Sequence, residues 1–281
     1  MRSDSKSRGK GAWTFMVIAV VLTAVFVRLG VWQLERLEAR RGDGLAASER
    51  LARPAVDLNA WLATWRGSAD ESADLVWRRV QLTGRPDYRN EIVLRGRLRD
   101  GAPGVHVATP VLIETGASAA DWGEAGAEAV LVIRGWLPAP DAMRANLRAV
   151  RPSAESPNEG APPETVYLTG FVVPSVERHT IPPQVIDFEG ESHTVLAALD
   201  LSDIREALPY AVAPVLVQRT DASETAAGAW SAEEMSGGWS VPAVLPPPAF
   251  DNGPHLAYAV QWFAFALISL VGGIAFVRRS R

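Results

Sequence analysis

The amino-acid sequence predicts an α+β membrane protein in which two transmembrane helices flank one β-rich extracytoplasmic domain. Three features support this fold class: an apolar run near each end of the chain, basic residues outside both runs, and strand-like segments between them. The strands are expected to form a mostly antiparallel sheet or a small barrel. Hydrophobic residues make up 48% of the chain and charged residues 21%, which is typical of a folded rather than a disordered domain.

The first transmembrane helix is predicted over residues 13–34, after a cytoplasmic tail of residues 1–12. Residues 13–27 carry no charge, and Arg28 lies close enough to one end to extend its guanidinium toward lipid headgroups. About twenty apolar residues suffice to cross a bilayer as a helix. A cleaved signal peptide is the alternative, but no small-residue cleavage site ends the run, and residues 34–38 continue the helical pattern.

The second transmembrane helix is predicted over residues 254–277, because residues 255–277 contain no Asp, Glu, Lys or Arg. Asn252 or Gly253 is expected to cap this helix, with Pro254 in its first turn. Residues 278–281 then form a second cytoplasmic tail. Basic residues favour the cytoplasmic side of a membrane, and both tails are basic, so both termini are predicted to be cytoplasmic. Arginines within residues 36–41 oppose this orientation, but only a hairpin of two spans satisfies both tails. Residues 35–253 are therefore expected to form the extracytoplasmic domain.

Seven segments of this domain have the β-branched and aromatic composition of strands. They cover residues 76–82, 91–98, 105–113, 129–137, 165–173, 194–199 and 212–219. Thr109-Pro110 interrupts the third segment, which favours an edge strand or a bulge, because proline cannot donate to a ladder. Helical pattern is confined to residues 40–65 and to a turn at 202–206 that Ser202 could cap. Residues 221–248, which end in three prolines, are predicted to be a linker into the second span.

The composition also excludes several classes of function. The chain has no cysteine, which rules out a disulfide scaffold, a thiolate nucleophile and an iron–sulfur cluster. A net charge of -4 argues against nucleic acid as a partner. No motif of a hydrolase, metalloprotease or nucleotide-binding enzyme is present, and no histidine pair has metal-site spacing. We therefore expect a protein that is not an enzyme, although scattered carboxylates leave a membrane-tethered hydrolase open.

The start of the second span holds the first group of candidate binding residues. Four residues recur at helical spacing on one face: His255, Tyr258, Trp262 and Phe265. An imidazole at the outer membrane boundary, with aromatic side chains further along the helix, suits a flat apolar macrocycle whose iron is bound by histidine. The alternative is an interfacial anchor, because aromatic residues gather at the boundaries of any membrane protein.

The end of the first span holds the second group. Arg28, Trp32 and Arg36 lie four residues apart on one helix face, with Gln33 beside them. The two arginines could pair with haem propionates, or they could extend to lipid headgroups. Because both spans end on the same side of the membrane, His255 and Arg36 are expected to lie at similar depth.

Two segments of the soluble domain, residues 104–110 and 134–138, are dense in special residues. From the residues alone they are interpreted as structural, with His106 as a strand histidine and a glycine that leaves room beside a packed tryptophan. Together with residues 29–36 and 255–263, however, these segments resemble the Surfeit-one (Surf-one) family of cytochrome c oxidase assembly factors. The four segments fall in the family's order, on a two-span layout that covers the whole chain.

The resemblance implies a multi-pass protein of the bacterial cytoplasmic membrane that helps to mature the haem a centres of the oxidase. Such a protein would bind haem a transiently and noncovalently and assist its insertion into oxidase subunit I. Membrane lipid, other assembly factors and haem a synthase are further partners that the resemblance implies. A cofactor-free membrane scaffold that stabilises an oxidase assembly intermediate is the alternative.

The resemblance also assigns the binding residues. His255, the histidine that opens the second span, would bind the haem iron. The residues implied to shape the surface that faces the haem are Trp32, Gln33, Arg36, Tyr258 and Trp262. The family often has asparagine directly before this histidine, whereas here Gly253 and Pro254 follow Asn252. Whether His106 adds a second iron ligand stays open.

Overall fold

A computed structural model of the chain describes residues 4–65, 68–113, 129–138, 147, 165–176, 181–188, 191–220, 243, 245–246 and 250–279. The chain divides into two compact units. One comprises Met1–Ala46 and Pro248–Arg281, and the other comprises Ala47–Pro247. The first unit is helical, and the second contains all the strands.

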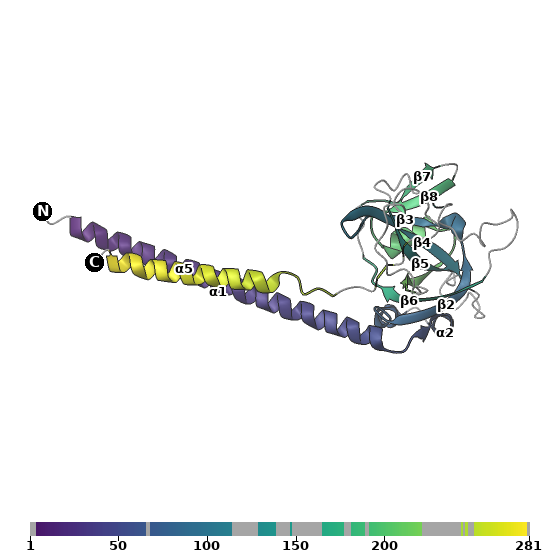
Figure 1. Cartoon of the computed structure of the whole chain (residues 1–281), viewed down its shortest axis with the longest axis horizontal. Coiled ribbons are helices and arrows are strands. Elements are labelled where there is room, and N and C mark those ends of the chain that lie inside the picture. Colours follow the sequence, from purple (N-terminus) through teal and green to yellow (C-terminus); the bar gives the residue numbers. More distant parts are fainter. Residues whose placement is uncertain are drawn as a thin grey trace. The chain divides into compact units, whose positions relative to one another are not determined.

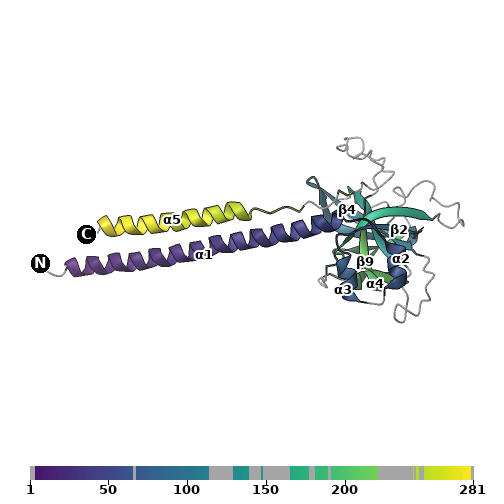
Figure 2. The same cartoon turned by 90° about the horizontal axis from the view of Figure 1, so that it is seen from below.

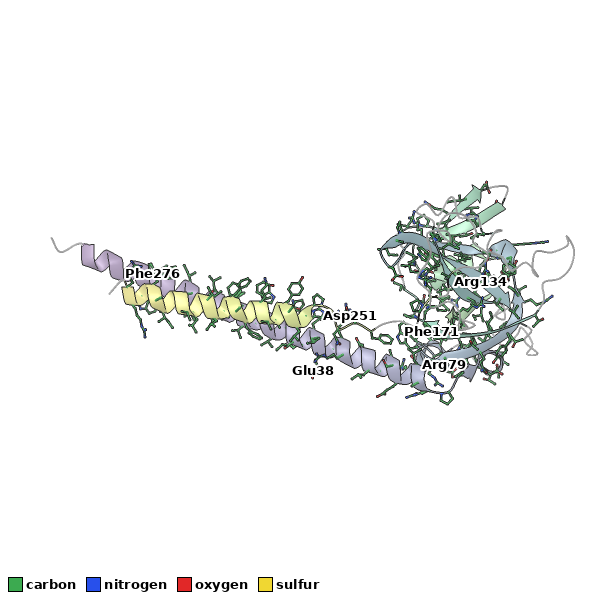
Figure 3. All side chains as sticks on the ribbon, in the orientation of Figure 1. Glu38, Arg79, Arg134, Phe171, Asp251 and Phe276 are labelled. Carbon is green, nitrogen blue, oxygen red and sulfur yellow. The ribbon has the colours of Figure 1, made fainter. Side chains whose placement is uncertain are left out.

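Two antiparallel helices, α1 (Asp4–Ala52) and α5 (His255–Arg279), lie side by side (Figures 1 and 2). The first unit contains α5 and the part of α1 up to Ala46. Both helices are long and apolar enough to cross a membrane. From Trp13 to Leu34 on α1 and along α5, many large apolar side chains are exposed (Figure 3 draws the side chains). Such a surface suits hydrocarbon, where helices satisfy their own backbone hydrogen bonds. The chain is therefore a membrane protein with two spans.

The two helices pack along a seam whose positions alternate by three and four residues, as in a left-handed helix pair. On α1 the seam comprises Ala19, Thr23, Phe26, Gly30, Gln33 and Leu37, and on α5 it comprises His255, Ala259, Trp262, Ala266, Ser269 and Gly273. Small residues bring the backbones close: a Cβ atom added at Gly273 would lie 2.7 Å from the Cβ of Ala19. Thr23 Oγ1 donates to the Ala19 carbonyl oxygen at 2.7 Å and approaches that of Ala266 at 3.4 Å.

A closed five-stranded barrel forms the centre of the second unit. Its strands are β2 (Arg79–Pro86), β4 (Ala102–Leu112), β5 (Ala129–Leu137), β6 (Val166–Val173) and β9 (Val212–Arg219). They are joined in the order β2-β6-β9-β5-β4, and a β2–β4 pairing closes the ring. Gly84 lies at this closure, where an added Cβ atom would meet the Leu112 carbonyl oxygen at 2.4 Å, so only glycine lets the strands approach this closely.

Three further strands continue from β4 on the open side: β3 (Ile92–Arg99), β8 (Glu191–Leu196) and β7 (Gln184–Phe188). A two-residue strand, β1 (Val56–Asp57), pairs with β2. Only the β1–β2, β3–β8 and β5–β9 pairs of the described strands are parallel. The predicted fold class, a mostly antiparallel sheet or small barrel flanked by two apolar helices, is confirmed.

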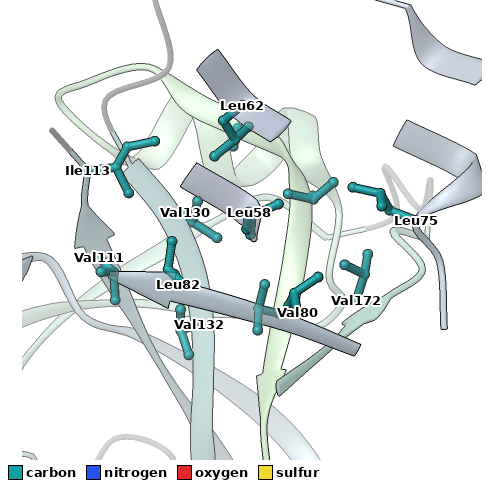
Figure 4. Close-up of a cluster of buried hydrophobic side chains, with 13 residues drawn as sticks. Leu58, Leu62, Leu75, Val80, Leu82, Val111, Ile113, Val130, Val132 and Val172 are labelled. Carbon is teal, nitrogen blue, oxygen red and sulfur yellow. The ribbon is translucent and has the colours of Figure 1, made fainter. Parts of the chain in front are cut away.

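The barrel interior is filled by one apolar cluster to which all five strands contribute (Figure 4). The short helix α2 (Leu58–Thr64) adds Leu58 and Leu62, both fully buried, and Asp57 caps this helix by accepting from the Ala60 amide. A second cluster lies on the opposite faces of β5, β6 and β9. There Leu131, Phe171 and Leu216 pack with Ile204 of α4 (Leu201–Ala207). The remaining short helices are α3 (Ala69–Asp74) and the 3-10 turn η1 (Tyr88–Asn90).

The helix predicted over residues 40–65 is wrong as one element. Helix α1 instead continues from the first span to Ala52, and α2 begins at Leu58. Pro54 explains the break, because proline disfavours helical geometry in the residue before it. The predicted cap of the 202–206 turn is wrong as well: Asp200 accepts from the Ser202 amide at 2.9 Å.

The edge strand predicted at Thr109-Pro110 is also wrong, since β4 pairs with β3 on one side and with β5 on the other. The Pro110 carbonyl oxygen accepts from the Asp87 amide at 2.8 Å. The backbone nitrogen and carbonyl of a strand residue face the same side. The Pro110 nitrogen, which carries no hydrogen, therefore faces Asp87 rather than β5, and no hydrogen bond of the β4–β5 ladder is lost. The alternative of a bulge at Thr109-Pro110 is wrong as well, because Ala108 to Leu112 pair one to one with β5. The register shift between Val107 and Ala108 is a bulge on β5, where Arg134 is the extra residue.

Most of the predicted linker, residues 221–248, lies outside the described residues. The described part returns to the β-rich unit: Ala243 pairs with Trp136 through two backbone hydrogen bonds of 2.8 and 2.9 Å. Leu245 packs against the second apolar cluster, and the Pro246 carbonyl oxygen accepts from Gln218 Nε2 at 3.1 Å. This stretch is therefore part of the domain rather than a free linker.

Candidate functional site

A hydrogen bond between His255 and Gln33 joins the first residue of α5 to the end of the first predicted span. His255 Nδ1 lies 2.9 Å from Gln33 Oε1, and both side chains are half-buried in the seam. Two residues far apart in the sequence thus meet at one level of the helix pair. The sequence placed both in the candidate site, but it did not predict that they touch.

The chemistry of this contact indicates which ring nitrogen of His255 carries a proton. An amide oxygen can only accept, so the hydrogen of the bond resides on His255 Nδ1. A neutral imidazole with a proton on Nδ1 carries its lone pair on Nε2. Metal-binding histidines commonly donate their other ring N–H to an oxygen acceptor in this way. In its neutral form His255 therefore has its lone pair on Nε2, while the bond to Gln33 orients the ring.

The segment that leads into α5 leaves space beside this nitrogen. Gly253 has a φ of +65°, and its amide donates to Asp251 Oδ1 at 3.1 Å. A Cβ atom added at Gly253 would lie 3.4 Å from Nε2 of His255, so any other residue would place its side chain against the nitrogen. Glycine therefore keeps one approach to Nε2 clear and adopts the left-handed turn without strain.

The cap of α5 differs from the prediction by one or two residues. The Pro254 carbonyl oxygen accepts the first helical hydrogen bond, from the Tyr258 amide at 3.1 Å. Pro254 thus occupies the N-cap position that was predicted for Asn252 or Gly253. Because the cap lies directly before His255, the histidine begins the helix proper, with its ring held by Gln33.

Aromatic residues line the seam further along α5. Trp262 stacks on Phe26 with ring centroids 5.8 Å apart, and Phe265 packs against both at 5.8 and 6.0 Å. Phe263 packs over Gly30, where an added Cβ atom would lie 2.6 Å from the ring. Of the face predicted for His255, Tyr258, Trp262 and Phe265, the structure places His255 and Trp262 in the seam. Phe265 contacts Phe26 from the edge of the seam, and Tyr258 is exposed.

The other predicted residues lie on the outward surface of the helix pair. Tyr258 is 47% exposed and Trp32 is 48% exposed. Arg28 is exposed and lies 3.5 Å from Glu35, and Arg36 is exposed as well. These side chains are therefore exposed, whereas His255 and Gln33 are half-buried in the seam.

The residues that are present fit a planar iron macrocycle at the end of the span. Such a group needs one nitrogen donor, a flat apolar surface and cations for its acidic edge. His255 supplies the donor, Gly253 leaves an approach to it open, and Arg36 is an exposed cation three residues after Gln33. Among the described residues, no group of three or more His, Cys, Asp or Glu could hold a bare metal ion.

His106 belongs to the β-rich unit, where it lies on β4 opposite Trp136 of β5. Burial, followed by the charge of Arg97, lowers the pKa of His106 from 6.5 to about 4. The imidazole is therefore neutral at neutral pH and packs as the strand histidine that the sequence predicted.

Acidification is expected to destabilise the β-rich unit through His106. Its pKa is lower folded than unfolded, so protonation favours the unfolded chain, and stability falls as the pH drops from 6.5 toward 4. Between about pH 7 and about pH 5 this loss should be on the order of 1–2 kcal/mol. Urea unfolding of the full chain in detergent, followed by tryptophan fluorescence, would measure it. His106→Gln should lose this part of the pH dependence; an identical slope in the variant would contradict the assignment.

A buried polar triad, which the sequence did not predict, connects β4 and β5 with Glu91, the residue directly before β3. Arg134 Nη2 donates to Glu91 Oε1 at 2.6 Å and its Nε donates to Thr109 Oγ1 at 2.7 Å, while Thr109 donates to Glu91 at 2.7 Å. Glu91 is 2% exposed, Thr109 0% and Arg134 6%. Arg134 also lies 5.1 Å from the centre of the Tyr88 ring. Two of the three residues belong to the segments 104–110 and 134–138. Polar residues of these segments therefore form hydrogen bonds that stabilise the fold.

Half-buried Asp87 and buried Asp200 are also engaged in structural bonds. Asp87 accepts from the Tyr210 hydroxyl at 3.0 Å and from Asn90 at 2.7 Å, and Asp200 caps α4. Burial, together with the Asp87 charge and hydrogen bond, raises the pKa of Tyr210, so this hydroxyl stays protonated and donates. Glu91, Asp87 and Asp200 therefore do not form a carboxylate pair of the kind that catalyses hydrolysis.

Comparison with known protein families identifies the chain. The family model described as the SURF1 family matches residues 20–267, which include part of each seam helix and the whole β-rich unit. A search of curated proteins finds no match. The match spans most of the chain and includes the His255–Gln33 pair. The chain therefore belongs to the SURF1 (Surf-one) family of assembly factors, which is associated with the assembly of cytochrome c oxidase.

Proposed function

We propose that this protein binds haem a noncovalently at the outer boundary of the bacterial cytoplasmic membrane and assists its insertion into subunit I of cytochrome c oxidase. The observation that supports this most directly is the 2.9 Å hydrogen bond from His255 Nδ1 to Gln33. It leaves Nε2 as a lone-pair donor at the end of two adjacent spans, beside a glycine that keeps one approach clear.

The position of the site in the membrane follows from the basic tails. Both chain ends carry basic residues, which favours cytoplasmic termini and puts the His255 end of the helix pair at the outer boundary. There the apolar macrocycle would lie against the aromatic residues of the span, and Arg36 is available for its propionates. The β-rich unit would then contact oxidase subunits, other assembly factors or haem a synthase.

Transient binding is consistent with the ligand set. Coordination by one histidine is weaker than coordination by two strong axial ligands, and a carrier must release its cargo. The chain has no cysteine, so a thioether attachment of the macrocycle is impossible. Both features favour delivery over permanent storage.

The proposal is tested by purifying the full chain in detergent from cells that make haem a and recording a pyridine haemochrome spectrum. We expect near-equimolar haem a, and much less haem from cells that make only haem b. A haem-free protein from cells that make haem a would overturn the proposal and favour the cofactor-free scaffold. Oxidase haem a content in cells that lack the protein gives a second measurement, and it should fall.

A further inference from the structure

We propose that Gln33 is the positioning residue for His255: its amide oxygen selects the tautomer that presents Nε2, and its neutrality keeps the imidazole a weak ligand that can release its cargo. This inference rests on the proposed haem-binding function and adds a role to a residue that was expected only to shape the surface facing the haem. The juxtaposition that supports it is the bond between Gln33 Oε1 and His255 Nδ1.

The surroundings of Gln33 hold its side chain in place. Gln33 occupies a seam position between Gly30 and Leu37, both of which are buried, and Gly30 packs against Phe263 of α5. A polar amide in a largely apolar seam is unfavourable unless it is hydrogen-bonded, so Gln33 and His255 each need the other. A polar pair within a helix seam also fixes the register of the two helices. The bond therefore orients the imidazole ring as well as its proton.

The neutral acceptor is the part of the arrangement that suits a carrier. A carboxylate hydrogen-bonded to the distal nitrogen of a metal-bound imidazole raises its basicity and strengthens its bond to the metal. An amide oxygen carries no formal charge and has a smaller effect. Glu35, the nearest acid along α1, lies on the exposed face with Arg28, whereas Gln33 lies in the seam. His255 is thus held in one orientation without being made a strong donor.

Two variants separate orientation from donor strength. Gln33→Leu removes the acceptor, and Gln33→Glu keeps an acceptor but adds charge. Gln261→Leu is the matched control, because Gln261 is exposed on α5 one residue before Trp262. In the haem-free protein, nitrogen-15 NMR of labelled histidines reports the tautomer, with the His255 signals assigned by their loss in His255→Ala. Wild type and Gln261→Leu should show the proton on Nδ1, whereas Gln33→Leu should show a mixture of tautomers.

In the haem-loaded protein, Gln33→Leu is expected to lower haem a affinity about 10- to 100-fold. Gln33→Glu should bind more tightly, shift the midpoint potential to more negative values and transfer haem to apomyoglobin about tenfold more slowly. Tautomer, affinity and transfer rate that match Gln261→Leu in both variants would overturn the inference. If the wild type binds no haem, the proposed function fails, yet the NMR measurement still decides whether Gln33 sets the tautomer. Gln33→Glu also remains informative if Gln33→Leu disturbs the helix pair.

Discussion

Arg134→Met is expected to lower the free energy of unfolding of the β-rich unit by about 3–5 kcal/mol. The substitution removes the only cation shown to bond Glu91 in the described chain and leaves that carboxylate buried at 2% exposure. Thr109 also loses the Nε donor that fixes its hydroxyl. A buried charge without its partner is far more costly than the pair itself, because it cannot regain water without opening the sheet.

Arg79→Met provides the control for this prediction. Arg79 is exposed on β2, so losing its charge should change stability by less than about 1 kcal/mol (Figure 3 labels both arginines). Urea unfolding of the full chain in detergent, monitored by tryptophan fluorescence, gives both values. The double variant Glu91→Leu with Arg134→Met should recover part of the loss, because no charge then remains buried. Equal effects of Arg134→Met and Arg79→Met would contradict the assignment of the triad.

The position of the triad explains why two separate segments of the sequence are so distinctive. Thr109 lies on the same face of β4 as Val107 and Val111, and these two valines belong to different apolar clusters. The polar triad thus lies where the barrel interior passes into the adjoining open sheet. Its hydrogen bonds connect β4 and β5 with the residue before β3 at this junction, where apolar side chains alone would leave the packing less specific.

The sequence predicted the fold well where a local pattern decides the structure. Two apolar runs predicted two helices, and β-branched runs predicted the positions of the barrel strands. The pairing of the strands was harder to predict from the sequence. The β2–β4 closure depends on Gly84, and the role of this glycine is visible only when Leu112 of the other strand lies beside it. The two-residue strand β1 and the strand β7 were missed because short or polar strands carry little periodicity.

The candidate site was predicted residue by residue but not as a pair. Spacing by four placed Arg28, Trp32 and Arg36 on one face of the first span, and this face is exposed. The buried seam instead follows a repeat of three and four residues through Phe26, Gly30 and Gln33. Comparing that repeat with the one that begins at His255 would have brought the two residues together, because each is the one large polar side chain in a seam of small and apolar residues.

His255→Ala is expected to remove haem a from the purified protein while both helices persist. The substitution deletes the nitrogen donor, and a flat apolar surface without an iron ligand retains a macrocycle weakly. His106→Gln is the matched control, because His106 is the other histidine considered as a ligand and is half-buried in the β-rich unit. Pyridine haemochrome spectra of both variants beside the wild type, with circular dichroism to verify helix content, provide the measurement.

Added imidazole distinguishes the loss of the iron ligand from misfolding of the variant. Free imidazole can occupy the space left by the deleted ring and supply a nitrogen donor, so millimolar-range imidazole should restore haem a binding to His255→Ala but not to a misfolded chain. The restored complex should exchange its ligand readily, because nothing ties it to Gln33. Retention of haem by His255→Ala together with its loss from His106→Gln would move the ligand to His106. Normal oxidase haem a content in cells that carry His255→Ala would instead make His255 an interfacial anchor, since a carrier without its ligand cannot supply the oxidase.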